Sequence, residues 1–382
     1  MTQPNPALSD LKTPCLLLEE ARMMANIRRL EKRAASLGVA LRPHLKTVKS
    51  VEAARRVLAA GHGPATVSTL REAEEFAKAG MLDILYAVGI APQKLPLVLA
   101  LREAGCDLTI ILDSEAQANA VAAASQAAGK PIPALIEIDS DGHRGGLAPE
   151  DPALIRIARI LLDSGAEFRG VLTHAGESYG AYGHEAQAKF ASLERAAAVL
   201  AAQTLRKAGL PCDVVSVGST PTAHAAQNLD GVTELRAGVY VFFDLVMAGI
   251  GVCQLEDIAL SVLTTVIGHQ KEKGWIIVDA GWMAMSRDRG TATQRLDQGY
   301  GLICDEAGHV LSGLVLSAAN QEHGVISLRA GESGQLPDMP VGARLRILPN
   351  HACATATQHQ GYNVVPADTS KPLQYWPRFS GW

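Results

Sequence analysis

The sequence predicts an α/β protein in which a (β/α)₈ barrel over residues 20–255 is followed by a smaller, mostly antiparallel β domain over residues 256–382. Helical segments and short apolar runs alternate between residues 20 and 240, as in a barrel of strand-helix units. No G-x-G-x-x-G fingerprint follows the first apolar run, which disfavours a dinucleotide-binding open sheet. After residue 255 helical spacing nearly disappears, and apolar and polar residues alternate as in antiparallel sheets.

Each barrel strand is expected to follow a helical segment. The helical segments are, in order, ARMMANIRRLEKRAASLG, SVEAARRVLAAG, REAEEFAKAG, KLPLVLALREAG, SEAQANAVAAASQAAG, a stretch near 151–164 and an alanine-rich one near 184–208. The eight strand candidates begin near residues 39, 64, 83, 107, 133, 168, 214 and 233. Short apolar runs between amphipathic helices are typical of a parallel sheet buried on both faces. Eight such units match a closed barrel, and a doubly wound open sheet is the alternative.

The C-terminal part reads as β structure. The alternating stretches are DIALSVLTTVIGHQ, GWIIVDAGWMAM, GLICDEAGHVLSG, GVISLRAG and GARLRILPN, with turns between them. We assign the opening stretch CLLLEE to the same domain, so that residues 1–19 join residues 256–382.

Composition and charge exclude several classes of protein. The net charge is -4 and no basic block occurs, so nucleic acid is not an expected partner. The apolar stretches are interrupted well before membrane-spanning length, and the first residues lack the pattern of a signal peptide. Six cysteines lie far apart without a C-x-x-C pair, which excludes a disulfide framework. We therefore expect a soluble cytoplasmic protein that contacts neither membrane nor nucleic acid.

Chemically active side chains follow several of the predicted strands. In a barrel of this kind the active site is built at the carboxyl ends of the strands. Lys46 follows the first strand, Arg144 the fifth, His174 the sixth, Gly218-Ser219-Thr220 the seventh, and Gly238 and Tyr240 the eighth. A lysine, an arginine, a histidine and a Gly-Ser-Thr turn are thus expected on one rim.

The Gly218-Ser219-Thr220 turn is a candidate phosphate site. Backbone N–H groups and hydroxyls of small residues hold phosphate well, and such sites often follow barrel strands seven and eight. Tyr240 is a candidate second donor to the same phosphate. The alternatives are an ordinary turn for the tripeptide and packing at a strand end for Tyr240.

A phosphate site together with a rim lysine points to pyridoxal phosphate, which needs a lysine for covalent attachment and groups around its ring. His174 is placed to stack on the ring, Arg144 to donate to the phenolic oxygen, and Tyr179 to reach the pyridine nitrogen. For these three residues capping, packing and a surface ion pair are the alternatives.

A second pair of candidates lies near the C-terminus, in LPNHACATATQ. If this segment is extended, His351 and Cys353 point to the same face. Imidazole and thiolate are ligands that zinc prefers. A turn histidine and a buried cysteine are the alternative, and two ligands leave a zinc site to be completed by water or substrate.

These motifs together resemble one family. They are RPHLKTVKS, TVSTLREAEEFAKAGMLDILYA, DSDGHRGG, LTHAGESY, VSVGSTPT, LRAGVYVFFD, VDAGWMAMSRD, NQEHG and PNHAC. The chain resembles, over nearly its whole length, the D-serine dehydratase and D-threonine aldolase group of pyridoxal phosphate enzymes with the alanine racemase-like fold.

The resemblance implies Lys46 as the Schiff-base lysine, and His351 and Cys353 as zinc ligands close to the cofactor. It also implies a homodimer. In the aldolase branch the metal pair more often reads His-x-Asp, so Cys353 favours a dehydratase that eliminates water from a small D-3-hydroxy amino acid. The alternatives are a metal-dependent aldolase, a non-catalytic pyridoxal phosphate carrier and, less favoured, a racemase. The cation for a β-carboxylate on the substrate stays open among Arg287, Arg289, His323 and others.

Overall fold

The structure is a computed structural model that describes residues 8–382, and the chain divides into two compact units. The barrel unit comprises Arg28–Gly238 and Ser380–Trp382, and the β unit comprises the residues up to Ile27 and Val239–Phe379. The expected boundary at residue 255 lies later than this division. The reason is that the segment after Gly238 bonds within the β unit, through Val246 N–H to Asn350 O (3.1 Å) and Ala259 N–H to Phe242 O (2.8 Å).

Eight parallel strands form the barrel, as the sequence predicts. They are β2 (Ala40–Leu41), β3 (Ala65–Val67), β4 (Asp83–Gly89), β5 (Asp107–Leu112), β6 (Pro133–Ile138), β7 (Glu167–Thr173), β8 (Val214–Val217) and β9 (Glu234–Leu235). The sheet order is β2-β9-β8-β7-β6-β5-β4-β3. A parallel bridge between His44 and Thr66 joins the end of β2 to β3 and closes the sheet.

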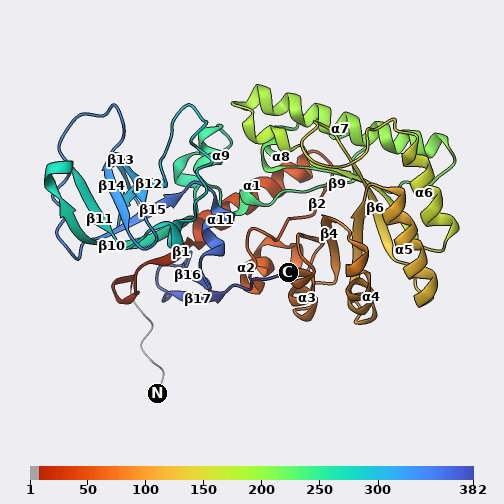
Figure 1. The fold of residues 1–382 in the computed structure, drawn as a ribbon, viewed down its shortest axis with the longest axis horizontal. Helices are drawn as coiled ribbons and strands as arrows, with labels where there is room; N and C mark the ends of the chain where they lie inside the picture. Colours follow the sequence, from red (N-terminus) through yellow and green to blue (C-terminus); the bar gives the residue numbers. More distant parts are fainter. Residues whose placement is uncertain (1–7) are drawn as a thin grey trace, which may run out of the picture. The chain divides into compact units, whose positions relative to one another are not determined.

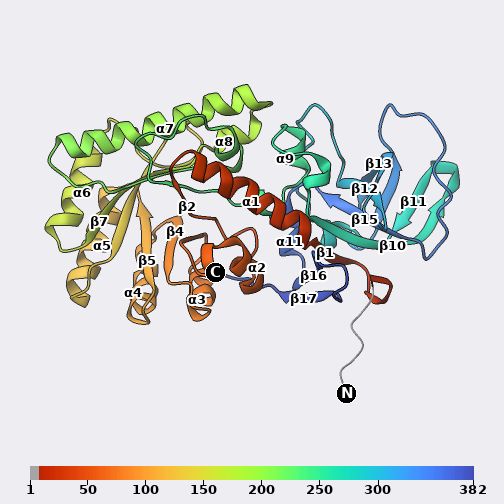
Figure 2. The same cartoon turned by 180° about the vertical axis from the view of Figure 1, so that it is seen from behind.

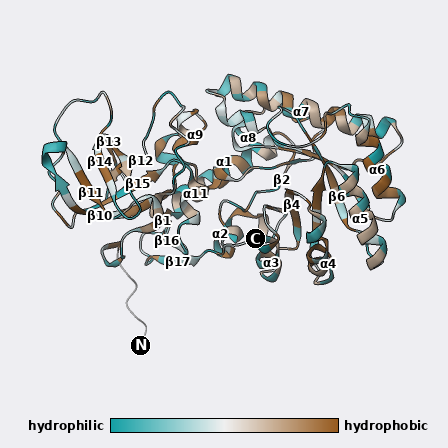
Figure 3. Ribbon diagram, viewed as in Figure 1, coloured by the Kyte–Doolittle hydropathy of each residue, from teal (hydrophilic) through white to brown (hydrophobic). Residues whose placement is uncertain are grey.

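Helices cover the outside of these strands (Figures 1 and 2). They are α1 (Glu20–Ser36), which begins in the β unit, α2 (Val51–Val57), α3 (Leu70–Lys78), α4 (Leu95–Glu103), α5 (Glu115–Ala128), α6 (Ala153–Asp163), α7 (His184–Lys207) and α8 (Thr220–Ala225). Side-chain caps fix two helix starts: Thr69 accepts from Glu72 N–H and Ser114 from Gln117 N–H. The barrel strands are apolar, whereas helices such as α7 have mixed surfaces (Figure 3).

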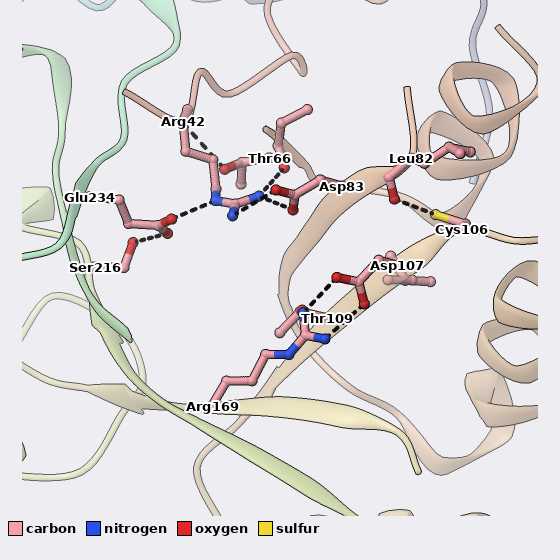
Figure 4. A network of polar contacts seen from close by, with 12 residues as sticks. Arg42, Thr66, Leu82, Asp83, Cys106, Asp107, Thr109, Arg169, Ser216 and Glu234 are labelled. Atoms are coloured by element: carbon pink, nitrogen blue, oxygen red, sulfur yellow. Dashed lines mark hydrogen bonds and ion pairs between the residues drawn. The ribbon is translucent and has the colours of Figure 1, made fainter. Parts of the chain in front are cut away.

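Carboxylates at the amino ends of three barrel strands pair with arginines (Figure 4). Arg42 binds Asp83 and Glu234, both at 2.7 Å, and Arg169 binds Asp107 at 2.8 Å. The three carboxylates lie at the starts of β4, β9 and β5, which is the end of a barrel associated with stability. These ion pairs therefore hold the barrel together at the end opposite the rim where active-site residues are expected.

The β unit contains a second sheet of nine mostly antiparallel strands, as expected. They are β1 (Cys15–Glu19), β10 (Leu260–Gln270), β11 (Trp275–Val278), β12 (Gly301–Asp305), β13 (Val310–Ala319), β14 (Gly324–Leu328), β15 (Arg344–Pro349), β16 (Gly361–Val365) and β17 (Gln374–Pro377). Six of the strands, in the order β11-β14-β13-β12-β15-β10, form a closed sheet, because β10 pairs with both β15 and β11. The stretch CLLLE forms β1 and pairs with β10, while residues 1–7 of the expected N-terminal part lie outside the described residues.

Three short helices interrupt the β unit: α9 (Leu245–Gly249), α10 (Trp282–Met285) and α11 (Ala352–Thr357). Two hydrogen bonds join α10 to α11 and its C-terminal end, from Thr355 Oγ1 to Met285 O (2.8 Å) and between His359 Nε2 and Ala284 O (2.9 Å). Within residues 8–382, no helix is long and apolar enough to span a lipid bilayer.

Candidate active site

The turn after β2 presents one of two nearby lysines to solvent. Leu45 N–H donates to Thr66 O (2.8 Å), which fixes the turn against β3. Lys49 Nζ lies 3.2 Å from the buried carboxylate of Glu72. Lys46 is exposed, and its Nζ has no hydrogen bond or ion pair within the described part of the chain. Lys46, unlike Lys49, is therefore available for chemistry.

Several of the predicted rim residues gather around His44. Burial lowers the pKa of this imidazole well below its usual value, and the nearby positive charges of Lys46, Arg236 and Arg144 lower it further. Arg144 itself is half exposed and lies 3.5 Å from Glu137 at the end of β6. The structure thus brings Lys46, Arg144 and His174 together although they follow different strands.

His174 is held as a neutral ring. Burial lowers the pKa of His174 to about 3. Its Nδ1 lies 2.9 Å from the carbonyl oxygen of Gly218, so the neutral ring carries its proton on Nδ1 and donates it. The ring of Tyr179 lies 6.1 Å away at an interplanar angle of 50°. A neutral, fixed imidazole is suited to stacking on a flat cofactor.

The Gly218-Ser219-Thr220 turn begins α8. Gly218 has φ +136°, and a Cβ there would lie 2.0 Å from Arg236 O, so only glycine fits. Ser219 is the N-cap and exchanges hydrogen bonds with Thr222 in a capping box. The Thr220 hydroxyl is buried and has no hydrogen-bond partner among residues 8–382. An unpaired buried donor beside a glycine turn fits a phosphate, and Thr220 contributes the free hydroxyl.

Gly238 allows the chain after β9 to approach the lysine turn. A Cβ at this position would lie 3.0 Å from Thr47 Oγ1 and 3.1 Å from His44 O. Tyr240 lies in the 3₁₀ helix Val239–Val241, which groups with the β unit, and its ring is fully buried.

Two buried charged residues of the barrel were absent from the sequence prediction. Glu194 on α7 accepts from Ala175 N–H and Gly218 N–H, each at 2.9 Å, and so ties the His174 loop to the glycine turn. Burial raises the pKa of this carboxyl group. Arg236 donates to Ser216 Oγ (2.6 Å) and to Thr173 O (2.7 Å). For Glu194 the available signal was an acidic residue among the buried positions of α7, most of which are alanine.

The condition under which His351 and Cys353 were expected to share a face, an extended segment, is not met. His351 is the N-cap of α11, and Cys353 lies inside that helix. The two side chains nevertheless meet, because the first turn of the helix brings the thiol to the ring. Burial lowers the pKa of His351, but its hydrogen bonds to Asp288 and Cys353 outweigh this effect and raise the pKa. We call His351 and Cys353 the metal pair.

Asp288 supports the metal pair. Its Oδ2 lies 2.7 Å from His351 Nδ1, which leaves Nε2 as the ring nitrogen that would bind a metal. Asp288 is carried by a tight turn in which Ser286 has φ +72° and its Oγ accepts from Asp288 N–H (3.2 Å). A carboxylate behind a ligand histidine is the usual support of a zinc site.

The donor set fits a zinc ion with open positions. An imidazole and a thiol lie side by side, and across residues 8–382 no group of three or more His, Cys, Asp or Glu side chains is arranged to hold a metal. Two protein ligands leave the other positions to water or substrate, as in catalytic zinc sites rather than closed structural ones.

Substitution of Asp288 by alanine is expected to weaken metal binding about 10- to 100-fold, because His351 loses the partner that orients its ring. Asp288→Asn should retain part of the affinity, since an amide oxygen still accepts from Nδ1–H. Zinc titration of the metal-free protein measures the affinity directly. Asp305→Ala, which removes the partner of the exposed His309 in the same unit, is the matched control. Equal zinc affinity in Asp288→Ala and Asp305→Ala would contradict the role.

Two known domain families match the chain. The alanine racemase N-terminal domain family matches residues 18–246, and the putative serine dehydratase domain family matches residues 259–365. Together the two matches span most of both units.

The chain is also similar to characterised proteins along its whole length. It is 57% identical over 378 residues to D-threo-3-hydroxyaspartate dehydratase from Delftia sp. (strain HT23), covering 98% of this chain and 99% of the relative. It is 30% identical to D-threonine aldolase from Arthrobacter sp., covering 95% and 91%. A solved structure, described as a C353A mutant of D-threo-3-hydroxyaspartate dehydratase in the metal-free form, superposes with a TM-score of 0.96 at 55% identity and covers 100% of both chains.

Proposed function

The chain belongs to the family that joins an alanine racemase N-terminal domain to a serine dehydratase domain, and on that premise we propose that it eliminates water from D-threo-3-hydroxyaspartate and yields oxaloacetate and ammonia. Members of this family are lyases that use pyridoxal phosphate and a metal. D-serine, which would yield pyruvate, is the second substrate that we propose. The identity with the Delftia dehydratase over nearly both whole chains carries the proposal.

In this proposal Lys46 holds the cofactor covalently and, once displaced by substrate, accepts the α-hydrogen. Bound pyridoxal phosphate supplies the electron sink for that proton removal. The exposed, unpaired Nζ of Lys46 supports the role. The other residues keep the roles predicted from the sequence. His174 stacks on the ring face, Arg144 donates to the phenolic oxygen and Tyr179 reaches the pyridine nitrogen. The phosphate is assigned to Gly218, Ser219, Thr220, Gly238 and Tyr240.

The metal pair supports elimination of the substrate hydroxyl group as the proposed chemistry. Hydroxide is a poor leaving group, and a divalent ion held by His351 and Cys353 would supply the Lewis acid that assists its departure from the β-carbon. Cys353 supports zinc, since thiolate is a ligand that zinc prefers. The solved relative that is described in a metal-free form supports the use of a metal in this family.

An aldolase is the second candidate, favoured by the 30% identity with D-threonine aldolase. It would use the same lysine and metal but would deprotonate the hydroxyl and break a carbon–carbon bond. Incubation of purified protein with D-threo-3-hydroxyaspartate and with D-serine separates the two. A dehydratase releases ammonia with oxaloacetate or pyruvate, whereas release of glycine would show that the aldolase assignment is correct.

A non-catalytic cofactor carrier is disfavoured by the presence of the β unit with its metal pair. We also propose that the active enzyme is a homodimer, as two-domain enzymes of this fold pair around a two-fold axis. Sedimentation of the active protein at twice the chain mass is the expected result. A fully active monomer would remove the dimer from the proposal.

A further inference from the structure

The proposed substrate sets a requirement that D-serine does not. The β-carbon of 3-hydroxyaspartate carries both the hydroxyl that leaves and a second carboxylate. If the hydroxyl is bound by the metal, the carboxylate on the same carbon lies close to the metal as well. A residue that recognises it must therefore come from the surroundings of the metal pair and must carry positive charge.

One arginine of the β unit stands apart from the others. Its other arginines after Gly238 all have hydrogen-bond, ion-pair or electrostatic partners: Arg289, Arg295, Arg329, Arg344, Arg346 and Arg378. Arg287 is exposed, and among residues 8–382 no hydrogen bond or ion pair is made by its side chain. A guanidinium without an acid partner is available to an anionic ligand.

Arg287 also lies at the right place. It immediately precedes Asp288, whose carboxylate contacts His351 at 2.7 Å, on the turn that begins with the positive-φ Ser286. Its guanidinium carbon lies 4.3 Å from the centre of the Trp282 ring. Trp282 opens α10, and α10 is hydrogen-bonded to the helix that carries Cys353. The arginine is therefore anchored to the same elements that build the metal pair.

The stacking leaves the donor edge of the guanidinium usable. An arginine that lies over an aromatic ring is held by its face, while its N–H groups remain free in the plane of the guanidinium. That edge matches a carboxylate with two parallel hydrogen bonds. Because the ring restricts the side chain before substrate arrives, less conformational entropy is lost on binding.

The other open candidates are weaker. Arg289 Nη2 is 2.6 Å from Asp297, and its guanidinium lies 5.2 Å from the centre of the Tyr300 ring, so it is already paired. His323 is exposed in the loop before β14. An imidazole lacks the two-pronged donor edge that a carboxylate binds best.

We propose that Arg287 binds the β-carboxylate of the substrate and sets the preference for D-threo-3-hydroxyaspartate over D-serine. This inference rests on the proposed dehydratase function, and it adds the residue that distinguishes the two substrates.

The test compares both substrates in Arg287→Gln and Arg287→Lys. In Arg287→Gln, kcat/KM for D-threo-3-hydroxyaspartate should fall roughly 10- to 100-fold, the effect of one charge-assisted hydrogen-bonded pair. The kcat/KM for D-serine should change less than about threefold, which also shows that the variant is folded. For Arg287→Lys, kcat/KM for D-threo-3-hydroxyaspartate should lie between the values of the wild type and Arg287→Gln, since lysine keeps the charge but lacks the two parallel N–H donors of the guanidinium. Lys273→Gln is the matched control, because Lys273 is another cation that lies over a tryptophan of the same unit. Its Nζ is 4.7 Å from the centre of the ring of Trp275, the first residue of β11.

A readout without turnover of the dicarboxylate completes the design. D-aspartate has the β-carboxylate but no hydroxyl to lose, and D-alanine has neither. As inhibitors of D-serine turnover, D-aspartate should weaken in Arg287→Gln and D-alanine should not. Equal loss for both substrates, or no change for either inhibitor, would overturn the role of Arg287. If the wild-type protein acts on D-serine and not on D-threo-3-hydroxyaspartate, the proposed substrate is wrong, and the inhibitor pair alone then decides whether Arg287 binds a β-carboxylate.

Discussion

Lys46→Ala is expected to lower turnover by roughly 10³-fold or more and to remove the visible absorbance of covalently held pyridoxal phosphate. The reason is that one amine performs two tasks, attachment of the cofactor and acceptance of the α-hydrogen. Lys46 is exposed and unpaired within the described residues, and thus open to both. Absorbance spectra and ammonia release measure the two effects separately.

The neighbouring lysine provides the comparison. Lys49 is bound to the buried carboxylate of Glu72, so Lys49→Ala is expected to lower stability while the absorbance band persists. Borohydride reduction of the wild-type protein followed by peptide mass spectrometry should find the cofactor on the peptide that contains Lys46. Attachment to another lysine, in the wild type or in Lys46→Ala, would show the assignment to be wrong.

Removal of the metal is expected to lower the rate of elimination about 100-fold or more and to leave the earlier removal of the α-proton intact. The metal assists only the departing hydroxide, whereas proton removal from the α-carbon depends on Lys46 and the cofactor. Chelated protein in deuterated water should therefore exchange the α-hydrogen of D-serine and release almost no ammonia. Added zinc should restore ammonia release.

Variants of the metal pair extend the same experiment. Cys353→Ala and His351→Ala should each lower zinc affinity and ammonia release together. His309→Ala, at an exposed histidine paired with Asp305 in the same unit, should change neither. A structural zinc would behave differently, since chelation would lower the melting temperature and release the cofactor. Full ammonia release from metal-free protein would rule out the leaving-group role.

Much of the fold follows from local patterns. All eight barrel strands lie within two residues of their predicted starts, and the stretch CLLLE pairs with β10 as expected. Such elements are predictable because the spacing of apolar residues reports directly which face of a helix or strand is buried. The metal pair was predicted from two ligand-type residues close in sequence, in a segment that is helical and not extended.

Partners distant in sequence were not predictable. Glu194 reaches Gly218 from α7, and Asp288 reaches His351 across the β unit. Lys46 was already named from the sequence, and the structure adds that the neighbouring Lys49 is paired with Glu72. In each case the deciding contact joins residues whose separation along the chain carries no periodic signal.

By itself, then, the sequence determined the order of the barrel and the β domain, the family resemblance, and the lysine and metal-pair motifs. Tertiary structure alone decided which side chains are already paired and which are left free, as with Arg287 among the arginines of the β unit. The physical reason is that burial of apolar surface is encoded locally and repeatedly, whereas a hydrogen bond or ion pair forms only where folding brings two particular groups within about 3 Å of each other.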